Sequence, residues 1–147
     1  MKNKGFTLIE ILVVIGIIAI LAAVAIVAIN PARQFAQANN AQRWSNVNTI
    51  LNAVYQYAID NNGSLPSTIT AVDTEICETN AASCTGLIDL SDITLNELYL
   101  VSMPLDPQCP DACLTDGVGY TISTSANGRV IVIAPDAQLG ETIKVTR

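Results

Sequence analysis

A chain of 147 residues is long enough for one domain, and its 13 acidic and seven basic side chains give a net charge of −6. Nucleic-acid binding needs clustered Lys and Arg side chains, so we predict none here. The sequence has no His and no Gly-rich phosphate loop, and we therefore predict that the protein is not an enzyme and uses no cofactor.

The first predicted element is an apolar helix, residues 6–29, in which Glu10 is the only charged side chain. At a rise of about 1.5 Å per residue this helix is about 36 Å long, enough to cross a hydrocarbon core of about 30 Å. Lys2 and Lys4 precede it and mark its N-terminal end as cytoplasmic. We therefore predict a single-pass protein of the cell (inner) membrane with an exported head.

Glu10 stands out because a carboxylate within an apolar helix costs roughly 2.5 kcal/mol or more in lipid when it has no partner. No basic side chain of the same segment lies within its reach. If the chain were cut between Gly5 and Phe6, the new α-amino group of a neighbouring copy could pair with Glu10. We interpret this acid as an assembly device.

The run KGFTLIE, residues 4–10, followed by the unbroken apolar segment, resembles the class III leader of type IV prepilins and pseudopilins. The resemblance implies that a prepilin peptidase makes the cut after Gly5 and N-methylates Phe6. It also implies that Thr7 and Glu10 take part in assembly of a helical filament of identical subunits. Loss of the leader would leave five basic and 13 acidic side chains, a net charge of −8.

The Asn30-Pro31 pair interrupts the helical pattern, because proline lacks a backbone donor and clashes with the preceding turn. We predict a helix break at Pro31, where the chain leaves the membrane. Most pilins and pseudopilins carry a proline a few residues earlier, at the position that Val27 holds here.

Residues 30–62 follow an amphipathic pattern with apolar side chains three and four apart. The apolar stripe consists of Phe35, Trp44, Val47, Ile50, Leu51, Val54, Tyr55 and Ala58. Asn40 and the other amides are expected on the remaining faces. We predict that the stripe packs on a sheet made by the C-terminal half and that residues 61–66 end the helix.

Four cysteines, Cys77, Cys84, Cys109 and Cys113, lie beyond the apolar segment. An even number in a short exported domain indicates two disulfides, for which three pairings are possible. We favour the local pairing, 77 with 84 and 109 with 113. A zinc site is the alternative, but these spacings match zinc knuckles poorly.

Residues 67–90 give few periodic signals and are expected to form a connecting region. Residues 91–101 are predicted to form a short helix, in which Thr94 and Glu97 have the spacing of a capping box. The prolines at positions 104 and 107 end it.

The remainder predicts three antiparallel strands, residues 119–124, 129–134 and 142–146, the first two joined by a tight Asn-Gly turn. The side chains expected to face the helix are Tyr120, Ile122, Val130, Val132, Ile143 and Val145. The fold class is therefore α+β, and the resemblance implies the type IV pilin fold, with a long N-terminal helix on a small sheet of about three strands.

These predictions divide the chain into a cleaved leader (1–5), a membrane and filament-core helix (6–29), an amphipathic helical half (30–62) and a globular head (63–147). Asp106, Asp111 and Asp116 surround the second cysteine pair. Some pseudopilins hold calcium in such a C-terminal loop, but the close alternation of a calcium loop is missing here, so we favour a solvated acidic turn and no metal.

Two functions remain within the resemblance. A type IV pilus subunit, serving adhesion, motility or DNA uptake, is favoured by the two disulfides, the missing calcium loop and the displaced proline. A major pseudopilin of a type II secretion system is favoured by the small size and by residues 57–66, which resemble the helix end of that class. The partners are accordingly the prepilin peptidase, further copies, the membrane before assembly, and pilus or secretion machinery. Under the pilus hypothesis, the mature subunit lies outside the cell after assembly.

Two other hypotheses dispense with filaments. A conventional signal peptide cut after Ala25 would release a soluble acidic domain beginning at Ile26. Alternatively, a single membrane anchor would carry a binding module that never polymerises.

Overall fold

The computed structural model describes residues 5–147. Its elements are helices α1 (Leu8–Ile29), α2 (Pro31–Asp60) and α3 (Ser91–Thr94), the 3-10 helix η1 (Leu95–Glu97), and strands β1 (Thr74–Cys77), β2 (Gly117–Thr124), β3 (Val130–Ala134) and β4 (Ile143–Thr146). The chain divides into two compact units between Phe35 and Ala36, and each is described by itself.

In the N-terminal unit, α1 ends at Ile29 and α2 begins at Pro31. Asn30 separates them with left-handed backbone angles, φ 48° and ψ 78°. Proline is well suited to the first position of a helix, where its missing N–H would have no helical partner. Its position therefore ends one helix and opens the next.

In the second unit, α2 contributes one face to the hydrophobic core. Val47, Ile50, Leu51, Val54 and Ala58 are buried, as predicted. The prediction is wrong for two further members of the stripe, because the side chains of Phe35 and Trp44 are 71% and 39% exposed.

Phe35 and Trp44 are exposed because the buried face of α2 includes polar residues, whereas the prediction expected apolar ones there. Residues 36, 40, 43 and 47 follow one another at spacings of four and three, and all four are buried. Two of them, Asn40 and Arg43, are polar, and an apolar pattern cannot identify such positions. The expectation that Asn40 would lie on an outer face is therefore wrong.

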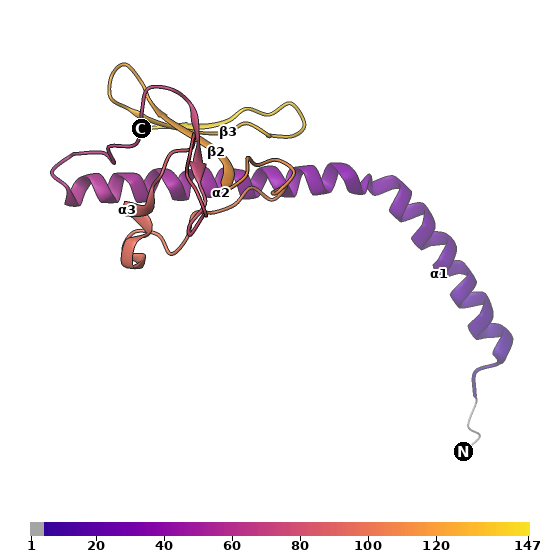
Figure 1. The fold of residues 1–147 in the computed structure, drawn as a ribbon. Coiled ribbons are helices and arrows are strands. Elements are labelled where there is room, and N and C mark those ends of the chain that lie inside the picture. The colour runs from indigo at the N-terminus through magenta and orange to yellow at the C-terminus, as the bar shows by residue number, and fades with distance from the viewer. Residues whose placement is uncertain (1–4) are drawn as a thin grey trace. The chain divides into compact units, whose positions relative to one another are not determined.

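The sheet has four strands in the order β1-β2-β3-β4, and all neighbouring strands are antiparallel. Figure 1 shows it lying across α2. The α+β class is confirmed, whereas the count of about three strands missed β1. This strand has only four residues, TEIC, which is too short to display an alternating pattern.

The predicted register of the sheet is confirmed. Val132 pairs with Ile122 on one side and with Val145 on the other, so these three side chains share one face of the sheet. Of the six predicted core positions, five are fully buried and Val145 is partly buried. In the turn between β2 and β3, the Ser125 N–H donates to the Arg129 carbonyl over 2.8 Å, and Gly128 takes a φ of 75°.

The prediction of a helix over residues 91–101 is wrong beyond its first turns. Asn96 and Glu97 both adopt left-handed backbone angles, with φ values of 55° and 56°, and these angles interrupt the helix. The predicted capping box is not formed, since the Thr94 hydroxyl donates to the Ser91 carbonyl instead, over 3.3 Å. Spacing alone could not predict this, because Asn tolerates left-handed angles but does not require them.

Candidate assembly segment and buried ion pair

The predicted cleavage site lies just before α1. Gly5 and Phe6 are exposed and belong to no helix or strand, and residues 1–4 of the predicted leader lie outside the described part of the chain. A Cβ atom added to Gly5 would meet no atom within 4 Å. The fold itself therefore gives no reason for glycine at this position.

Thr7 and Glu10 form a capping box at the start of α1. The Glu10 N–H donates to Thr7 Oγ1 over 3.3 Å, and the Thr7 N–H donates to Glu10 Oε2 over 3.4 Å. The carboxylate also lies in the first turn, where the helix dipole favours negative charge. Within a single chain, Glu10 therefore binds the N-terminus of its own helix.

The apolar surface of α1 is uncovered. All 22 of its residues are exposed, and the mean hydropathy of an 18-residue window reaches 3.3. Among residues 5–147, α1 is the one helix that is long and apolar enough to cross a membrane. Exposed apolar patches of this size mark membrane or protein contacts.

Both cysteine pairs are local and lie in the second unit. Disulfides join Cys77 to Cys84 and Cys109 to Cys113, which is the pairing that the sequence favours. Within the described chain, no three His, Cys, Asp or Glu side chains are grouped as a metal site requires. The cysteines thus close loops in the head.

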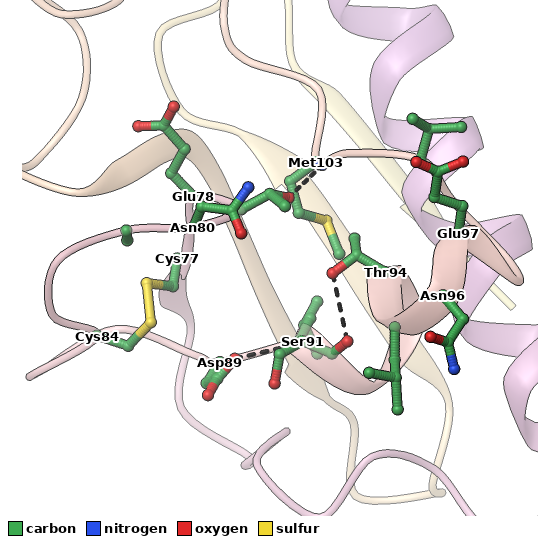
Figure 2. Close-up of a pocket in the computed structure, with 15 residues that line it drawn as sticks. Cys77, Glu78, Asn80, Cys84, Asp89, Ser91, Thr94, Asn96, Glu97 and Met103 are labelled. Atoms are coloured by element: carbon green, nitrogen blue, oxygen red, sulfur yellow. Dashed lines mark hydrogen bonds between the residues drawn. A yellow bond between two sulfur atoms is a disulfide. The ribbon is translucent and has the colours of Figure 1, made fainter.

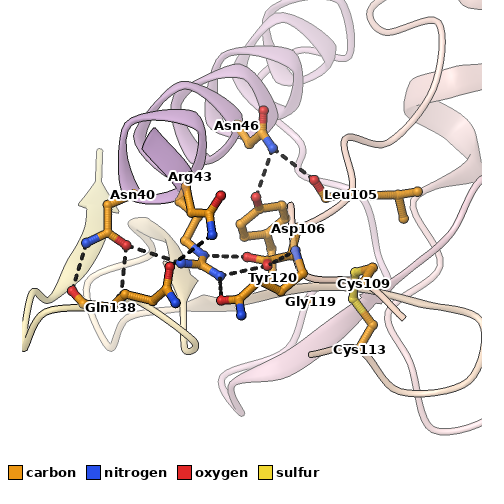
Figure 3. Close-up of polar contacts among 12 residues, drawn as sticks. Asn40, Arg43, Asn46, Leu105, Asp106, Cys109, Cys113, Gly119, Tyr120 and Gln138 are labelled. Carbon is orange, nitrogen blue, oxygen red and sulfur yellow. Dashed lines mark hydrogen bonds and ion pairs between the residues drawn. A yellow bond between two sulfur atoms is a disulfide. The ribbon is translucent and has the colours of Figure 1, made fainter. Parts of the chain in front are cut away.

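A buried ion pair joins α2 to the loop before β2. Arg43 and Asp106 are fully buried, with Arg43 Nε 2.6 Å from Asp106 Oδ2 and Nη2 2.8 Å from Oδ1. The guanidinium also donates to the side chain of Asn40 over 3.1 Å (Figure 3). It donates to the side chain of Gln108 over 2.8 Å. Two-point pairs of this kind combine strength with a fixed geometry.

Amide side chains extend this network on both sides. Asn40 donates to the Gln138 carbonyl over 2.7 Å and accepts from the Gln138 N–H over 2.9 Å, which fixes the loop between β3 and β4. Asn46 donates to the Tyr120 hydroxyl over 2.8 Å and to the Leu105 carbonyl over 3.1 Å. Among residues 5–147, every buried side-chain nitrogen and oxygen has a hydrogen-bond partner.

The prediction that Asp106 belongs to a solvated acidic turn is wrong. Its carboxylate is 0% exposed and accepts from the Gln108 N–H in addition to Arg43. Close packing here depends on Gly119, at φ 79°, because a Cβ would come within 2.7 Å of Asp106 Cβ and 2.9 Å of Cys113 Sγ. Arg43 is 63 residues away, so no local pattern around Asp106 could indicate the pairing.

The network also shifts proton equilibria. The hydrogen bond between Arg43 and Asp106 raises the pKa of Arg43 above its usual value, so the guanidinium stays charged. Burial raises the pKa of Tyr120 to about 12. Both shifts keep the cluster in the protonation state that its hydrogen bonds require.

The fold and the N-terminal segment support a type IV pilin-like or pseudopilin-like subunit. A family model described as the prokaryotic N-terminal methylation motif matches residues 1–26. The chain thus carries the class III prepilin leader of type IV pilins and pseudopilins, and the resemblance is confirmed. Searches of curated proteins and of solved structures found no match.

The predicted assembly residues and the buried ion pair differ in how far the sequence indicates them. Gly5, Phe6, Thr7 and Glu10 lie together at the start of α1, as their spacing requires. Arg43 was missed, although a signal was present: it is the only charged residue between positions 34 and 59. A lone charge in a helix that packs on a core is a candidate for a buried ion pair.

We predict that Asp106→Asn destabilises the head by about 3–5 kcal/mol, because it leaves the Arg43 charge buried without a counter-ion. Urea unfolding of the purified chain in detergent, followed by fluorescence of Trp44, measures this loss. The double variant Arg43→Met/Asp106→Leu should lose less than the single variant. Asp111→Asn, at an exposed acid of the same loop, serves as the control, and equal losses in all three variants would contradict the assignment.

A second prediction concerns alkaline pH. The pKa of Tyr120 is about 12 in the folded chain and about 10 when unfolded, so its stabilising contribution is complete below pH 10 and is lost as pH rises to 12. Removing the ionisable hydroxyl with Tyr120→Phe should abolish a fall of roughly 2–3 kcal/mol in the free energy of unfolding over this interval. An unchanged pH profile in the variant would exclude Tyr120 as the cause.

Proposed function

We propose that this chain is the structural subunit of a type IV pilus and that it polymerises through α1. The observation that carries the proposal is the methylation motif at the head of an uncovered apolar helix whose single acid is Glu10. An exposed helix of this composition needs lipid or other copies of itself as surroundings. In this proposal α1 lies in the membrane before assembly and packs against other copies of α1 in the filament afterwards.

In this mechanism a prepilin peptidase cuts between Gly5 and Phe6 and methylates the Phe6 amine. The capping box keeps Glu10 hydrogen-bonded to its own Thr7 while the subunit stands in the membrane. During assembly the carboxylate pairs with the Phe6 amine of a neighbouring copy. An ion pair removes the cost of an isolated carboxylate in an apolar bundle, so docking favours the register in which the two groups meet.

The second candidate is a major pseudopilin of a type II secretion system. The end of α2 favours it: the run of residues 57–66 resembles that class, and Asn62 and Gly63 take the left-handed angles of a helix terminus. Two disulfides favour the pilus, and so does the engagement of Asp106 with Arg43, which leaves this carboxylate unavailable to a calcium ion. The two candidates share processing and assembly and differ in the length and place of the filament.

Processing predicts a defined N-terminus. Mass analysis of the mature chain should find methylated Phe6 as its first residue, whereas Gly5→Leu should leave the leader in place because a bulky side chain blocks the peptidase. Gly16→Ala is the matched control, since a Cβ at this glycine also meets nothing within 4 Å and it lies outside the leader. A mature chain starting at Ile26 would instead identify a conventional signal peptide.

Assembly predicts a requirement for the charge of Glu10. Electron microscopy of cells expressing Glu10→Val should show few or no filaments, although cleavage and head stability stay unchanged. Glu10→Gln keeps an acceptor for the capping hydrogen bond and removes the charge, so it should fail as well. Normal filaments in both variants would favour the non-polymerising anchor, and long wild-type filaments on the cell surface would exclude a purely periplasmic pseudopilus.

A further inference from the structure

An open groove of about 580 Å³ lies between the Cys77–Cys84 loop and the segment that contains α3 and η1 (Figure 2). Its lining includes the acids Glu78, Asp89 and Glu97 and no Lys or Arg. Two buried apolar side chains, Leu90 and Met103, also line it. The groove therefore combines apolar wall with uncompensated negative charge.

One edge of the groove carries exposed apolar side chains. Leu95, Leu98 and Val101 are 63–67% exposed, and the first and last of them line the groove. The left-handed angles of Asn96 and Glu97 between them stop the helix that would otherwise continue here. Contiguous exposed apolar residues with a polar rim are typical of protein contacts.

The chain itself carries a group of opposite charge that fits this groove. Arg129 is exposed at the end of the turn between β2 and β3, and residues 125–128 of that turn are Ser, Ala, Asn and Gly, which make a narrow tip. Within the described chain the only ion pair is that of Arg43 with Asp106, so Arg129 is not neutralised by an acid of its own subunit. An arginine can lay its aliphatic stem on apolar wall while its guanidinium pairs with carboxylates.

The two other cations of the head that are not buried are placed differently. Arg147 donates to the Asn52 side chain over 2.9 Å and lies 5.7 Å from the centre of the Tyr55 ring. Lys144 lies within β4 opposite Ile133, on a strand and not on a turn. Arg129 is thus the cation that a projecting turn presents.

We propose that the turn of residues 125–129 of one subunit docks in this acidic groove of a second copy, with Arg129 attracted by the negative charge that Glu78, Asp89 and Glu97 give the groove. The inference rests on the proposed function, because it names a contact between heads in the same filament. Turn and groove are different surfaces, so the contact is heterologous and each subunit keeps a free groove or turn for the next. A heterologous contact builds an open filament when the rotation between successive subunits does not close a ring, and this is the geometry that the proposal requires.

The test places a reactive amine at the turn of the full-length chain. Filaments assembled from Arg129→Lys keep the charge, and a water-soluble carbodiimide joins amines to carboxylates in direct contact. The expected product is a dimer in which position 129 is linked to Glu78, Asp89 or Glu97. This dimer should not form when detergent separates the subunits before the carbodiimide is added. Wild-type filaments are the control, since the amine of Lys144 should not link to these acids.

Charge reversal gives an independent readout. Arg129→Glu should reduce the number of filaments about tenfold, and the combination of Arg129→Glu with Glu97→Arg should restore them. Lys144→Glu changes the net charge equally and should leave filament number unchanged. Links from position 129 to other sites, or normal filaments in Arg129→Glu, would overturn this contact and leave the proposed function standing, whereas a wild-type chain that forms no filaments would overturn both.

Discussion

The head of this protein depends on the pairing of Arg43 with Asp106. Neither charge contacts water, so each requires the other, and the folded arrangement must bring a residue of α2 against the loop before β2. Hydrophobic contacts tolerate small shifts of a helix on a sheet, whereas a two-point ion pair with Asn40 and Gln108 attached to it does not. We infer that the pair contributes more to the position of α2 than to total stability, since burying two charges offsets much of their attraction.

The disulfide between Cys109 and Cys113 belongs to the same arrangement. It closes residues 109–113, directly after Asp106 and Gln108, and the missing side chain of Gly119 leaves room for the Cys113 sulfur and for Asp106. Glu75 secures the far end of the loop by accepting from the Gly119 N–H over 2.7 Å. Loop, strand and helix are thus joined by polar contacts, while the apolar core lies between α2 and the sheet.

The sequence was informative where a signal is local. The apolar run before Asn30, the proline after it and the alternation around Ile122 and Val132 each depend on neighbouring residues, and each corresponds to the observed structure. The N-terminal segment is a short linear motif and was recognised for the same reason.

What the sequence did not show depends on residues far apart in the chain. Strand β1 exists because β2 pairs with it, and its own four residues have no pattern that indicates a strand. Arg43 and Asp106 are 63 residues apart, and the isolation of Arg43 among uncharged residues does not indicate which acid is its partner. The apolar character of Trp44 predicts a core position, yet the neighbouring Arg43 occupies the buried face of the helix.

The wide separation of these partners also bears on how fast the head folds. The partners of the α2 residues Arg43, Asn46 and Asn40 lie 63, 74 and 98 residues further along the chain. Contacts over such distances form slowly, because the loop entropy is lost before the contact is gained. A chain that depends on such contacts is expected to fold slowly for its length, because Arg43 gains its counter-ion only when α2 meets the loop before β2. The loop between β3 and β4, through Gln138, covers a face of α2 that lies almost a hundred residues earlier in the sequence.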